Sequence, residues 1–301
     1  MPIRNSREPQ HKRARREVER EEVANCENGG KAFLFEGAVR RGHLFAMLIH
    51  AAHRFSSTVI VRFDCSGMRL MGDGVPSALP FEIRFVRNAW LFYRSTYLLR
   101  TKEACTVRFC AQRLHWLLEY SAMTAGDCLR LWITKDGSQL GLATDGMHAA
   151  IPCSLVYGES HRFHATDCTL RSDDELQVDC ADLRRMLRQV AVGGEDTFVS
   201  LHQYDGDVYL DLRSEITQMN DPAGYVAAHT VVTNVYDDVS EALLCLQSVL
   251  NAKPLRVALE IVWEDCEAHI SLVSDLPLRM TFVWYQYAEL TYYGKNAEAV
   301  H

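Results

Sequence analysis

The chain has 301 residues, 48% of them hydrophobic and 24% charged, which is enough for two domains and a large buried core. Lys and Arg number 32 and Asp and Glu 39; the net charge of -7 excludes a histone-like polycation, and a nucleic-acid binder would need its basic residues gathered on one surface. The ten cysteines form no Cys-x-x-Cys pair and indicate the reduced thiols of an intracellular protein, and the sequence has neither a signal-peptide pattern nor an apolar run of the roughly 18 residues that a membrane span needs.

The first 30 residues are rich in charge and lack aromatic residues. Such a segment buries too little apolar surface to offset its ordering entropy, so we expect a disordered tail over residues 1–30. Its basic cluster, Lys12, Arg13, Arg15 and Arg16, is typical of a nuclear localisation signal or a nucleic-acid arm, and predicts a nuclear protein. The alternative is a solvated run of charges.

From residue 31 onward, a strand–helix–strand–strand pattern recurs four times. In the first unit, helical spacing over 42–55 predicts an amphipathic helix, preceded by a strand at 33–39 and followed by a hairpin over 58–72. The predicted buried stripe of this helix is Leu44, Met47, Leu48, Ala51 and Phe55.

The second and third units repeat this order. Helices are predicted over 111–122 and 181–194, each followed by two strands joined at an Asp-Gly turn, Asp136-Gly137 and Asp205-Gly206. Their predicted buried stripes are Leu114, Leu117, Leu118 and Ser121 in the second unit and Leu183, Met186, Leu187 and Val190 in the third.

The fourth unit is expected to place its helix over 238–252, with strands from residue 255 onward. The apolar spacing that predicts this helix consists of Val239, Leu243, Leu246 and Leu250.

Together the four units predict an α+β fold with two similar domains, each with two helices packed on a mostly antiparallel sheet. The first domain is expected over 31–148 and the second over 173–296. A polar connector over 149–172 would join them, and residues 297–301 would form a short tail.

This organisation resembles the DNA sliding clamps of the PCNA-like superfamily, which includes proliferating-cell nuclear antigen and the subunits of the heterotrimeric checkpoint clamp. The resemblance covers residues 33–295. The segments that resemble PCNA are SGMRL (66–70), NAKPL (251–255), SDLPL (274–278) and ELTYY (289–293). The segments closer to the Hus/Rad-type checkpoint subunits are WLFYRSTYLL (90–99) and CLRLWITKDGSQLGLAT (128–144).

The resemblance implies a non-enzymatic clamp subunit without a cofactor, which encircles duplex DNA in a three-membered ring and tethers replication or repair enzymes. Residues 71–79 lack the Met-Asp-x-x-His run that PCNA uses in its partner pocket, which favours a checkpoint or repair subunit. A replicative or viral processivity factor forming a homotrimer stays open, as does a nuclear scaffold that has lost DNA contact.

In clamps of this kind the helices line the hole, so the helix faces opposite the apolar stripes are expected to meet the phosphates without reading bases. The residues predicted to bind DNA are Arg40, Arg41, His50, His53, Arg54, Arg113, Arg184, Arg185, Arg188 and Lys253. The second and fourth helix faces are not basic, and partner subunits could supply the missing charge.

Partner peptides are expected to bind where they bind in other clamps, at Leu155, Val156, Tyr157 and Tyr293, with simple packing as the alternative.

No metal site or catalytic motif is expected. His161, His164 and Cys168, with Asp167, have a spacing that could ligate zinc, but no second ligand cluster accompanies them. The sequence also lacks the Walker A, GxGxxG, GxSxG and HExxH motifs. We therefore expect no enzyme.

Overall fold

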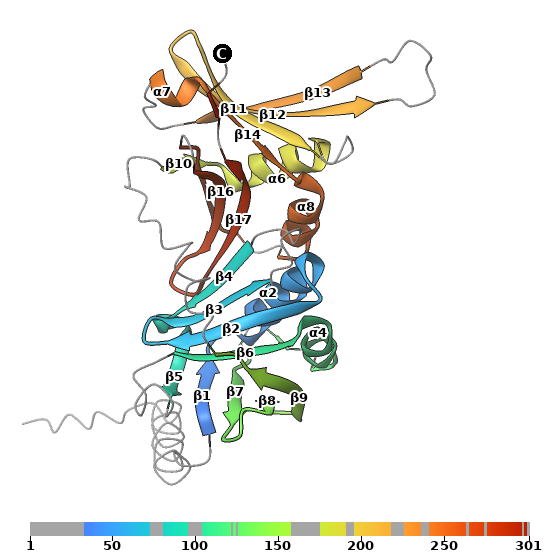
Figure 1. Ribbon diagram of the computed structural model, residues 1–301, viewed down its shortest axis with the longest axis vertical. Helices are drawn as coiled ribbons and strands as arrows, with labels where there is room; N and C mark the ends of the chain where they lie inside the picture. Colours follow the sequence, from blue (N-terminus) through green and yellow to red (C-terminus); the bar gives the residue numbers. More distant parts are fainter. Residues whose placement is uncertain are drawn as a thin grey trace, which may run out of the picture.

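The computed structural model describes the core of both predicted domains. The described residues are 33–72, 81–95, 104–121, 123–124, 126–157, 175–190, 196–217, 226–235, 241–262, 265–273, 276–296 and 298–299. They form two halves, which follow one another along the long axis of the molecule (Figure 1).

The first half begins with a strand, a helix and a run of strands, and repeats this order once. Its elements are β1 (Phe33–Val39), α2 (Gly42–Phe55), β2 (Thr58–Asp64), β3 (Gly67–Gly72), β4 (Phe81–Val86), a 3-10 turn η1 (Arg87–Ala89), β5 (Trp90–Ser95), β6 (Cys105–Cys110), α4 (Ala111–Tyr120), β7 (Leu129–Thr134), β8 (Gln139–Thr144) and β9 (Met147–Leu155).

The second half follows the same plan with one extra short helix. Its elements are β10 (Glu175–Val178), α6 (Cys180–Val190), β11 (Thr197–Tyr204), β12 (Asp207–Thr217), β13 (Val226–Val235), α7 (Glu241–Leu244), β14 (Leu246–Leu250), α8 (Ala252–Ile261), β15 (Glu267–Ser271), β16 (Pro277–Trp284), β17 (Ala288–Asn296) and β18 (Glu298–Ala299).

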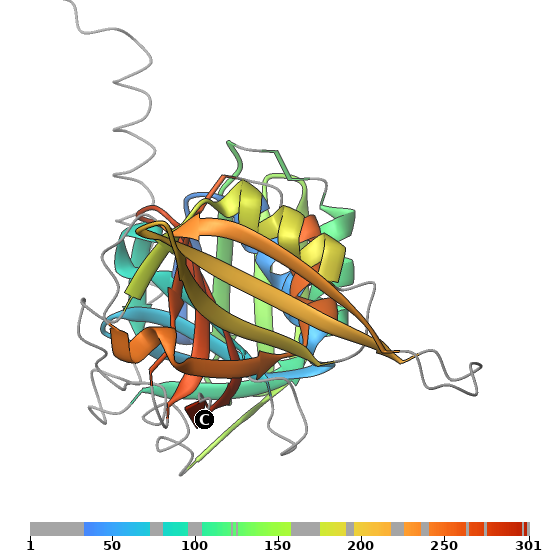
Figure 2. The same ribbon diagram turned by 90° about the horizontal axis from the view of Figure 1, so that it is seen from above.

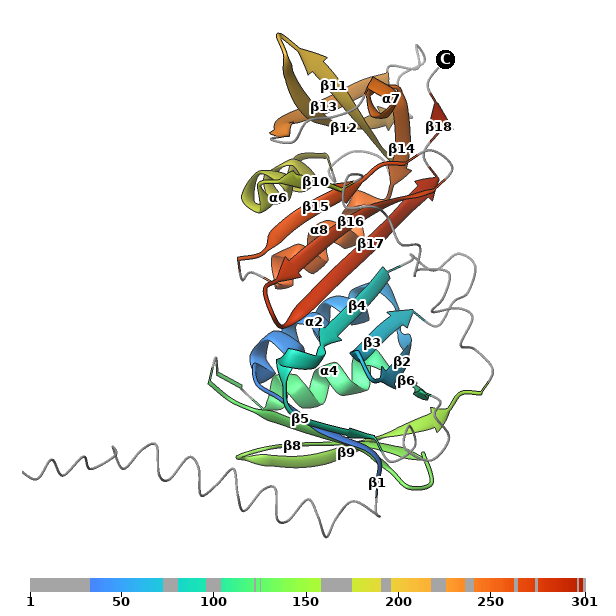
Figure 3. The same ribbon diagram turned by 90° about the vertical axis from the view of Figure 1, so that its left-hand side faces the viewer.

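The larger of two antiparallel sheets contains strands of both halves. One sheet runs in the order β10-β15-β16-β17-β4-β3-β2-β6-β9-β8-β7-β1-β5, and a smaller one runs β13-β12-β11-β14-β18. The link between the halves is the ladder between β17 and β4, in which Ala288 pairs with Phe85 and Tyr292 with Phe81 (Figure 3). The expected α+β class, with helices packed on antiparallel sheet in two similar halves, is confirmed.

Helix α6 is held by the apolar stripe that the sequence predicts. In α6 the side chains of Leu183, Met186, Leu187 and Val190 are completely buried, and α6 packs across β12 and β13 (Figure 2). Each buried Leu or Val of this kind contributes about 1.5–3 kcal/mol relative to leaving it exposed. Tertiary packing therefore stabilises a helix of only three turns.

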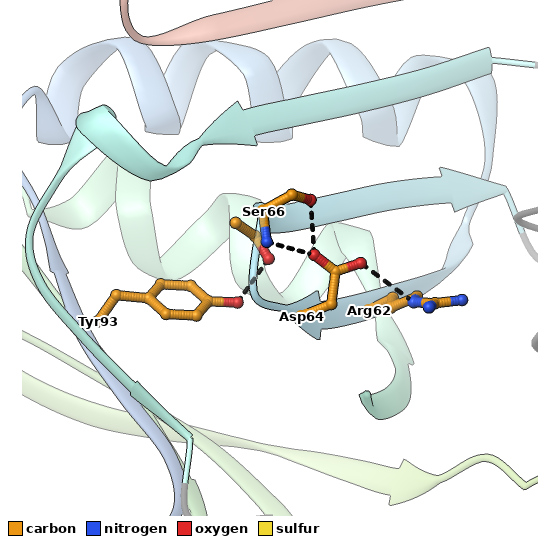
Figure 4. Close-up of polar contacts among 5 residues, drawn as sticks. Arg62, Asp64, Ser66 and Tyr93 are labelled. Carbon is orange, nitrogen blue, oxygen red and sulfur yellow. Dashed lines mark hydrogen bonds and ion pairs between the residues drawn. The ribbon is translucent and has the colours of Figure 1, made fainter. Parts of the chain in front are cut away.

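The hairpin between β2 and β3 is fixed by polar contacts around its turn (Figure 4). Asp64 accepts hydrogen bonds from the Ser66 amide at 2.9 Å and the Ser66 hydroxyl at 2.6 Å, and pairs with Arg62 at 3.2 Å. The Tyr93 hydroxyl of β5 donates to the carbonyl of Gly67. Gly67 has a φ of +135°, which an L side chain rarely adopts, so the turn requires glycine.

The fourth helix prediction is wrong. Residues 246–250 form strand β14, in which Leu246, Ser248 and Leu250 alternate inward, and among the described residues just before it 241–244 are helical. Leu246 and Leu250 are spaced by four residues, which fits the period of a helix and also the period of two of a strand. The sequence analysis therefore assigned a helix where the structure has a strand.

The true fourth helix is α8, where strands were expected. Its N-cap is Asn251, whose side chain accepts a hydrogen bond from the Lys253 amide at 3.2 Å. Pro254 is tolerated in the first turn, where backbone N–H groups have no intrahelical partner. The buried face of α8 consists of Ala252, Leu255, Ala258 and Leu259.

The predicted connector begins later than expected. Strand β9 continues to Leu155, so residues 149–155 belong to the sheet. Alternation in this stretch is weak because Ala149, Ala150 and Pro152 carry little apolar bulk. Residues 158–174 lie outside the described residues.

Candidate nucleic-acid interface

The helices form one continuous layer on one side of the sheets. Helix α4 packs on α2, α2 on α8, and α8 on α6, so the layer runs in the order α4-α2-α8-α6. Figure 1 shows the four helices following one another down one side of the molecule. Their outer faces together make a single surface, which we call the helix layer.

The helix layer is basic although the chain is acidic. The four helices contain seven Lys or Arg residues and three acids, so their formal charge is +4, whereas that of the whole chain is -7. The seven basic residues are Arg54, Arg113, Arg184, Arg185, Arg188, Lys253 and Arg256. This is the segregation of charge that an acidic protein needs if it is to bind a polyanion.

Helix α6 carries the strongest part of this charge. The side chains of Arg185 and Arg188 are 60% and 61% exposed, on the face opposite the buried stripe, as the sequence predicts. Arg185 pairs with Asp182 one turn earlier at 2.7 Å. Arg184 lies at the flank, where its guanidinium donates to the carbonyl of Val262 at 2.8 Å. Exposed pairs of this kind contribute little to stability, so Arg185 can exchange its carboxylate for a phosphate.

A shallow depression lies between α6 and α8. Arg184, Arg188 and Arg256 line it together with a single acid, Glu260. The Glu260 carboxylate is 3.7 Å from the Arg188 Nε and 3.9 Å from the Arg256 Nε. Three guanidinium groups beside one carboxylate leave the rim of this depression with a net positive charge.

The sequence missed Arg256 as a member of this surface. Its position was assigned to a strand, and a strand residue cannot be placed on the helix layer. The N-cap and first-turn signal Asn251-Ala252-Lys253-Pro254 was the feature that could have found it.

The end of the layer formed by α2 and α4 is less charged. The rings of His50 and His115 stack at 3.9 Å between centroids, and His53 lies 5.7 Å from His115. Burial, with His115 and Arg54, lowers the pKa of His50 to about 4. Burial also lowers the pKa of His53 and His115, although Glu119 opposes the effect at His115. The three side chains are therefore mostly neutral near pH 7, and the DNA contacts of His50 and His53 stay predictions.

This cluster predicts that the fold weakens in mild acid. The pKa of His50 is lower in the folded chain than in the unfolded one, so the unfolded chain binds more protons between pH 6.5 and about 4. Stability is complete above pH 6.5 and falls as the pH drops through this window. We expect a loss of about 1 kcal/mol between pH 7.5 and pH 5 after allowance for solvent screening, measured by urea unfolding, and a smaller loss in His50→Gln. An equal pH dependence in the two proteins would contradict the assignment.

Exposed aromatic side chains share this end of the layer. Trp116 is 52% exposed and Tyr120 is 88% exposed, one turn apart on α4. Helix α4 contains one Arg, Arg113, and one acid, Glu119, so its formal charge is zero. This agrees with the expectation that its face is not basic.

The remaining predicted DNA contacts are spread unevenly. Arg54, Arg113 and Lys253 are exposed on the helix layer. Arg40 precedes α2 and is exposed outside the helices. Arg41 lies over the ring of Tyr287 at 4.9 Å, so it holds the start of α2 against the β16–β17 turn.

The residues predicted to bind partner peptides do not form one cluster of neighbouring strands. Leu155 pairs with Val107 of β6, the Val156 amide donates to Thr106 at 2.9 Å, and Tyr157 is 71% exposed. Tyr293 lies on β17, and strands β4, β3, β2 and β6 separate β17 from β9 in the sheet. Five strand spacings amount to roughly 24 Å, so only a peptide crossing the sheet could contact both ends.

The predicted basic cluster Lys12, Arg13, Arg15 and Arg16 lies outside the described residues. So do His161, His164, Asp167 and Cys168, for which no metal site is expected. Within the described residues, no group of three His, Cys, Asp or Glu side chains is placed to hold a metal ion. None of the described helices is both long and apolar enough to cross a membrane.

The fold is similar to that of solved protein structures, although the sequence alone finds no match. The sequence matches no family model and no curated protein. The structure is similar to that of the PCNA of A. fulgidus, solved with the C-terminal region of FEN-1 bound, with a TM-score of 0.62 and 11% identity over 89% of this chain and 100% of that one.

Two further PCNA structures match to the same degree. One is the PCNA2-PCNA3 complex of Sulfolobus tokodaii, with a TM-score of 0.63 and 12% identity over 86% of this chain and 99% of that one. The other is the PCNA of Entamoeba histolytica, with a TM-score of 0.60 and 13% identity over 87% and 99% of the two chains. The similarity expected from the sequence is confirmed: the chain has the fold of the PCNA-like sliding clamps.

Proposed function

We propose that the chain is a non-enzymatic subunit of a ring that encircles duplex DNA. The observation that carries this proposal is the helix layer, whose charge of +4 stands out in a chain of -7 on a clamp fold. Exposed Arg and Lys side chains bind phosphates without reading bases, and such contacts let a protein slide along DNA.

Free strand edges support ring closure between subunits. Among the described residues, β13 pairs only with β12. Strand β9 pairs with β8 over residues 147–152 and with β6 only from Cys153 to Leu155, so its first part is unpaired on one side. An exposed edge is a template for pairing with another chain, and a closed ring removes such edges. We propose that β9 of one subunit and β13 of the next form this joint.

Within the clamps, we propose a checkpoint or repair subunit acting in the nucleus. The support is the absence of the Met-Asp-x-x-His run from residues 71–79, together with a helix layer that is basic at α6 and α8 but nearly neutral at α4. Partner subunits of different sequence would supply the missing charge. The replicative or viral homotrimer is the second candidate, and the strand edges that are unpaired at β9 and β13 favour it because they are compatible with self-association.

Two of the similar structures illustrate the partners that we propose. One pairs different clamp subunits, PCNA2 and PCNA3, and the other has FEN-1 bound to PCNA. By analogy, this chain would assemble with other clamp subunits and would tether repair enzymes or polymerases to DNA.

The solution mass tests the checkpoint proposal. Light scattering at micromolar concentration is expected to give a mass near the 34.2 kDa of one chain, because the ring would need other subunits. A mass three times as large would favour the replicative homotrimer instead. A second measurement is the binding of the single chain to a DNA duplex at low salt. Both kinds of clamp subunit should bind the duplex, whereas a scaffold that has lost DNA contact should not.

A further inference from the structure

Two cysteines from distant parts of the chain meet at the start of α6. Cys180 is the first residue of α6, and Cys266 comes directly before β15, 86 residues later. Their sulfur atoms are 2.8 Å apart, and both side chains are half-buried. A disulfide needs its sulfurs at about 2.05 Å, so a small movement of the side chains would join them.

The surroundings activate one of the two thiols. The hydrogen bond shared with Cys266, followed by the positive charge of Arg184, holds the pKa of Cys180 below its usual value, against burial and the charges of Asp179 and Asp265. The guanidinium of Arg184 also lies 3.7 Å from the Cys266 sulfur. A thiol at a helix N-terminus beside an arginine is the environment in which cysteines become reactive thiolates.

Other cysteines of the chain lie in the opposite environment. Burial raises the pKa of Cys105 to about 12 and that of Cys153 to about 11. These thiols stay protonated at neutral pH and react slowly with oxidants, because the thiolate is the reacting form. The difference sets Cys180 apart from them, whereas the hydrogen bond to Cys180 and then burial raise the pKa of Cys266.

We propose that Cys180 and Cys266 form an oxidation site that hydrogen peroxide converts to a disulfide. The proposal does not depend on whether the chain binds DNA. It assigns Cys180 as the attacking thiol and Cys266 as the resolving thiol.

The reaction balances in two steps. The Cys180 thiolate attacks one oxygen of hydrogen peroxide, the O–O bond breaks, and the leaving hydroxide takes up a proton and becomes water. The Cys266 sulfur then attacks the resulting Cys180 sulfenic acid, the S–S bond forms, and the hydroxyl group leaves as a second water with the thiol proton. Two thiols lose two electrons in total, and one peroxide is reduced to two waters.

The disulfide would tie the start of α6 to the residue just before β15. Residues 180 and 266 enclose α6, β11, β12, β13, β14 and α8, so the bond closes a long loop. Cross-links that close long loops restrict the unfolded chain most strongly. Oxidation is therefore expected to raise the melting temperature of the full chain by several degrees.

The test uses the full chain, purified in the reduced state and titrated with hydrogen peroxide. Free thiols are then blocked by alkylation, and the digested protein is analysed by mass spectrometry. The expected result is a peptide pair linked through Cys180 and Cys266 at peroxide levels that leave Cys105 and Cys153 alkylatable, with reversal by dithiothreitol. A peroxide response that oxidises other cysteines without producing this pair would overturn the proposal.

Conservative variants test the two roles separately. In Cys266→Ser the resolving thiol is absent, so a sulfenic acid should accumulate at Cys180 and react with dimedone. Cys65→Ser, which changes an exposed cysteine elsewhere, should leave the yield of the Cys180–Cys266 disulfide unchanged. Absence of a dimedone adduct at Cys180 in a folded Cys266→Ser protein would show that Cys180 is not the attacking thiol.

Discussion

Replacing Arg185 and Arg188 together with Glu is expected to remove most of the salt-dependent binding of the chain to duplex DNA. Both side chains are about 60% exposed on the centre of the basic α6 face, and neither packs in the core. Losing two phosphate contacts and adding two repulsive charges should weaken binding roughly 30- to 100-fold at low salt. The slope of log K against log salt should fall by about 2. Fluorescence anisotropy with a labelled duplex at several salt concentrations measures both quantities.

A matched control changes the same charge elsewhere. Lys135 lies in the β7–β8 turn, and Arg213 lies on β12 between the inward-facing Leu212 and Ser214, so it points away from α6. The variant Lys135→Glu with Arg213→Glu alters the net charge equally but leaves the helix layer intact. It should bind DNA within about threefold of the wild type. Equal losses in the two variants would mean that net charge, and not the helix layer, controls binding.

Gly67→Ala is expected to be the most damaging small substitution in the chain. An added Cβ would lie 2.2 Å from the carbonyl oxygen of Phe85, which is backbone and cannot rotate away. The φ of +135° adds strain for any L residue. Together these effects should reduce the free energy of unfolding by about 3–5 kcal/mol, measured by urea denaturation with circular dichroism.

Two other glycines separate the sources of this loss. Gly206 has a φ of +91° but open space around its Cα, so Gly206→Ala should cost only the backbone strain, about 1–2 kcal/mol. Gly126 also has open space around its Cα, and no left-handed φ, so Gly126→Ala should be nearly neutral. If Gly67→Ala and Gly206→Ala cost the same, the contact with Phe85 would be relaxed by movement of the hairpin.

The sequence predicted the fold well where one periodicity dominates. The helices α2 and α6 begin within one residue of their expected positions, because their stripes of leucine and methionine have no competing period of two. The stretch from 238 to 261 failed because Leu246, Ser248 and Leu250 fit both periods, and Val257, Leu259 and Ile261 resemble a strand. In this stretch the apolar spacing fits both a helix and a strand. The Asn251 cap is the feature that marks the start of helix α8.

The interface was only partly predictable. Arg185 and Arg188 follow from the helical wheel, since a residue opposite a buried stripe must face outward. The neutral state of His50 could not be read from its own helix, because it depends on His115 of α4. The stacking of Arg41 on Tyr287 likewise joins residues almost 250 positions apart in the sequence. Contacts of this range depend on how distant elements pack together, which residue spacing does not encode.

The ladder between β4 and β17 bears on where a ring of such chains would open. Five residue pairs join these strands, α2 packs on α8 beside them, and Arg41 rests on Tyr287 at the same junction. Separating the halves of one chain would break all three at once, whereas the proposed joint between β9 and β13 would pair strands of two different chains. A ring that must open to admit DNA would therefore open between its subunits, and each chain would move as a rigid body.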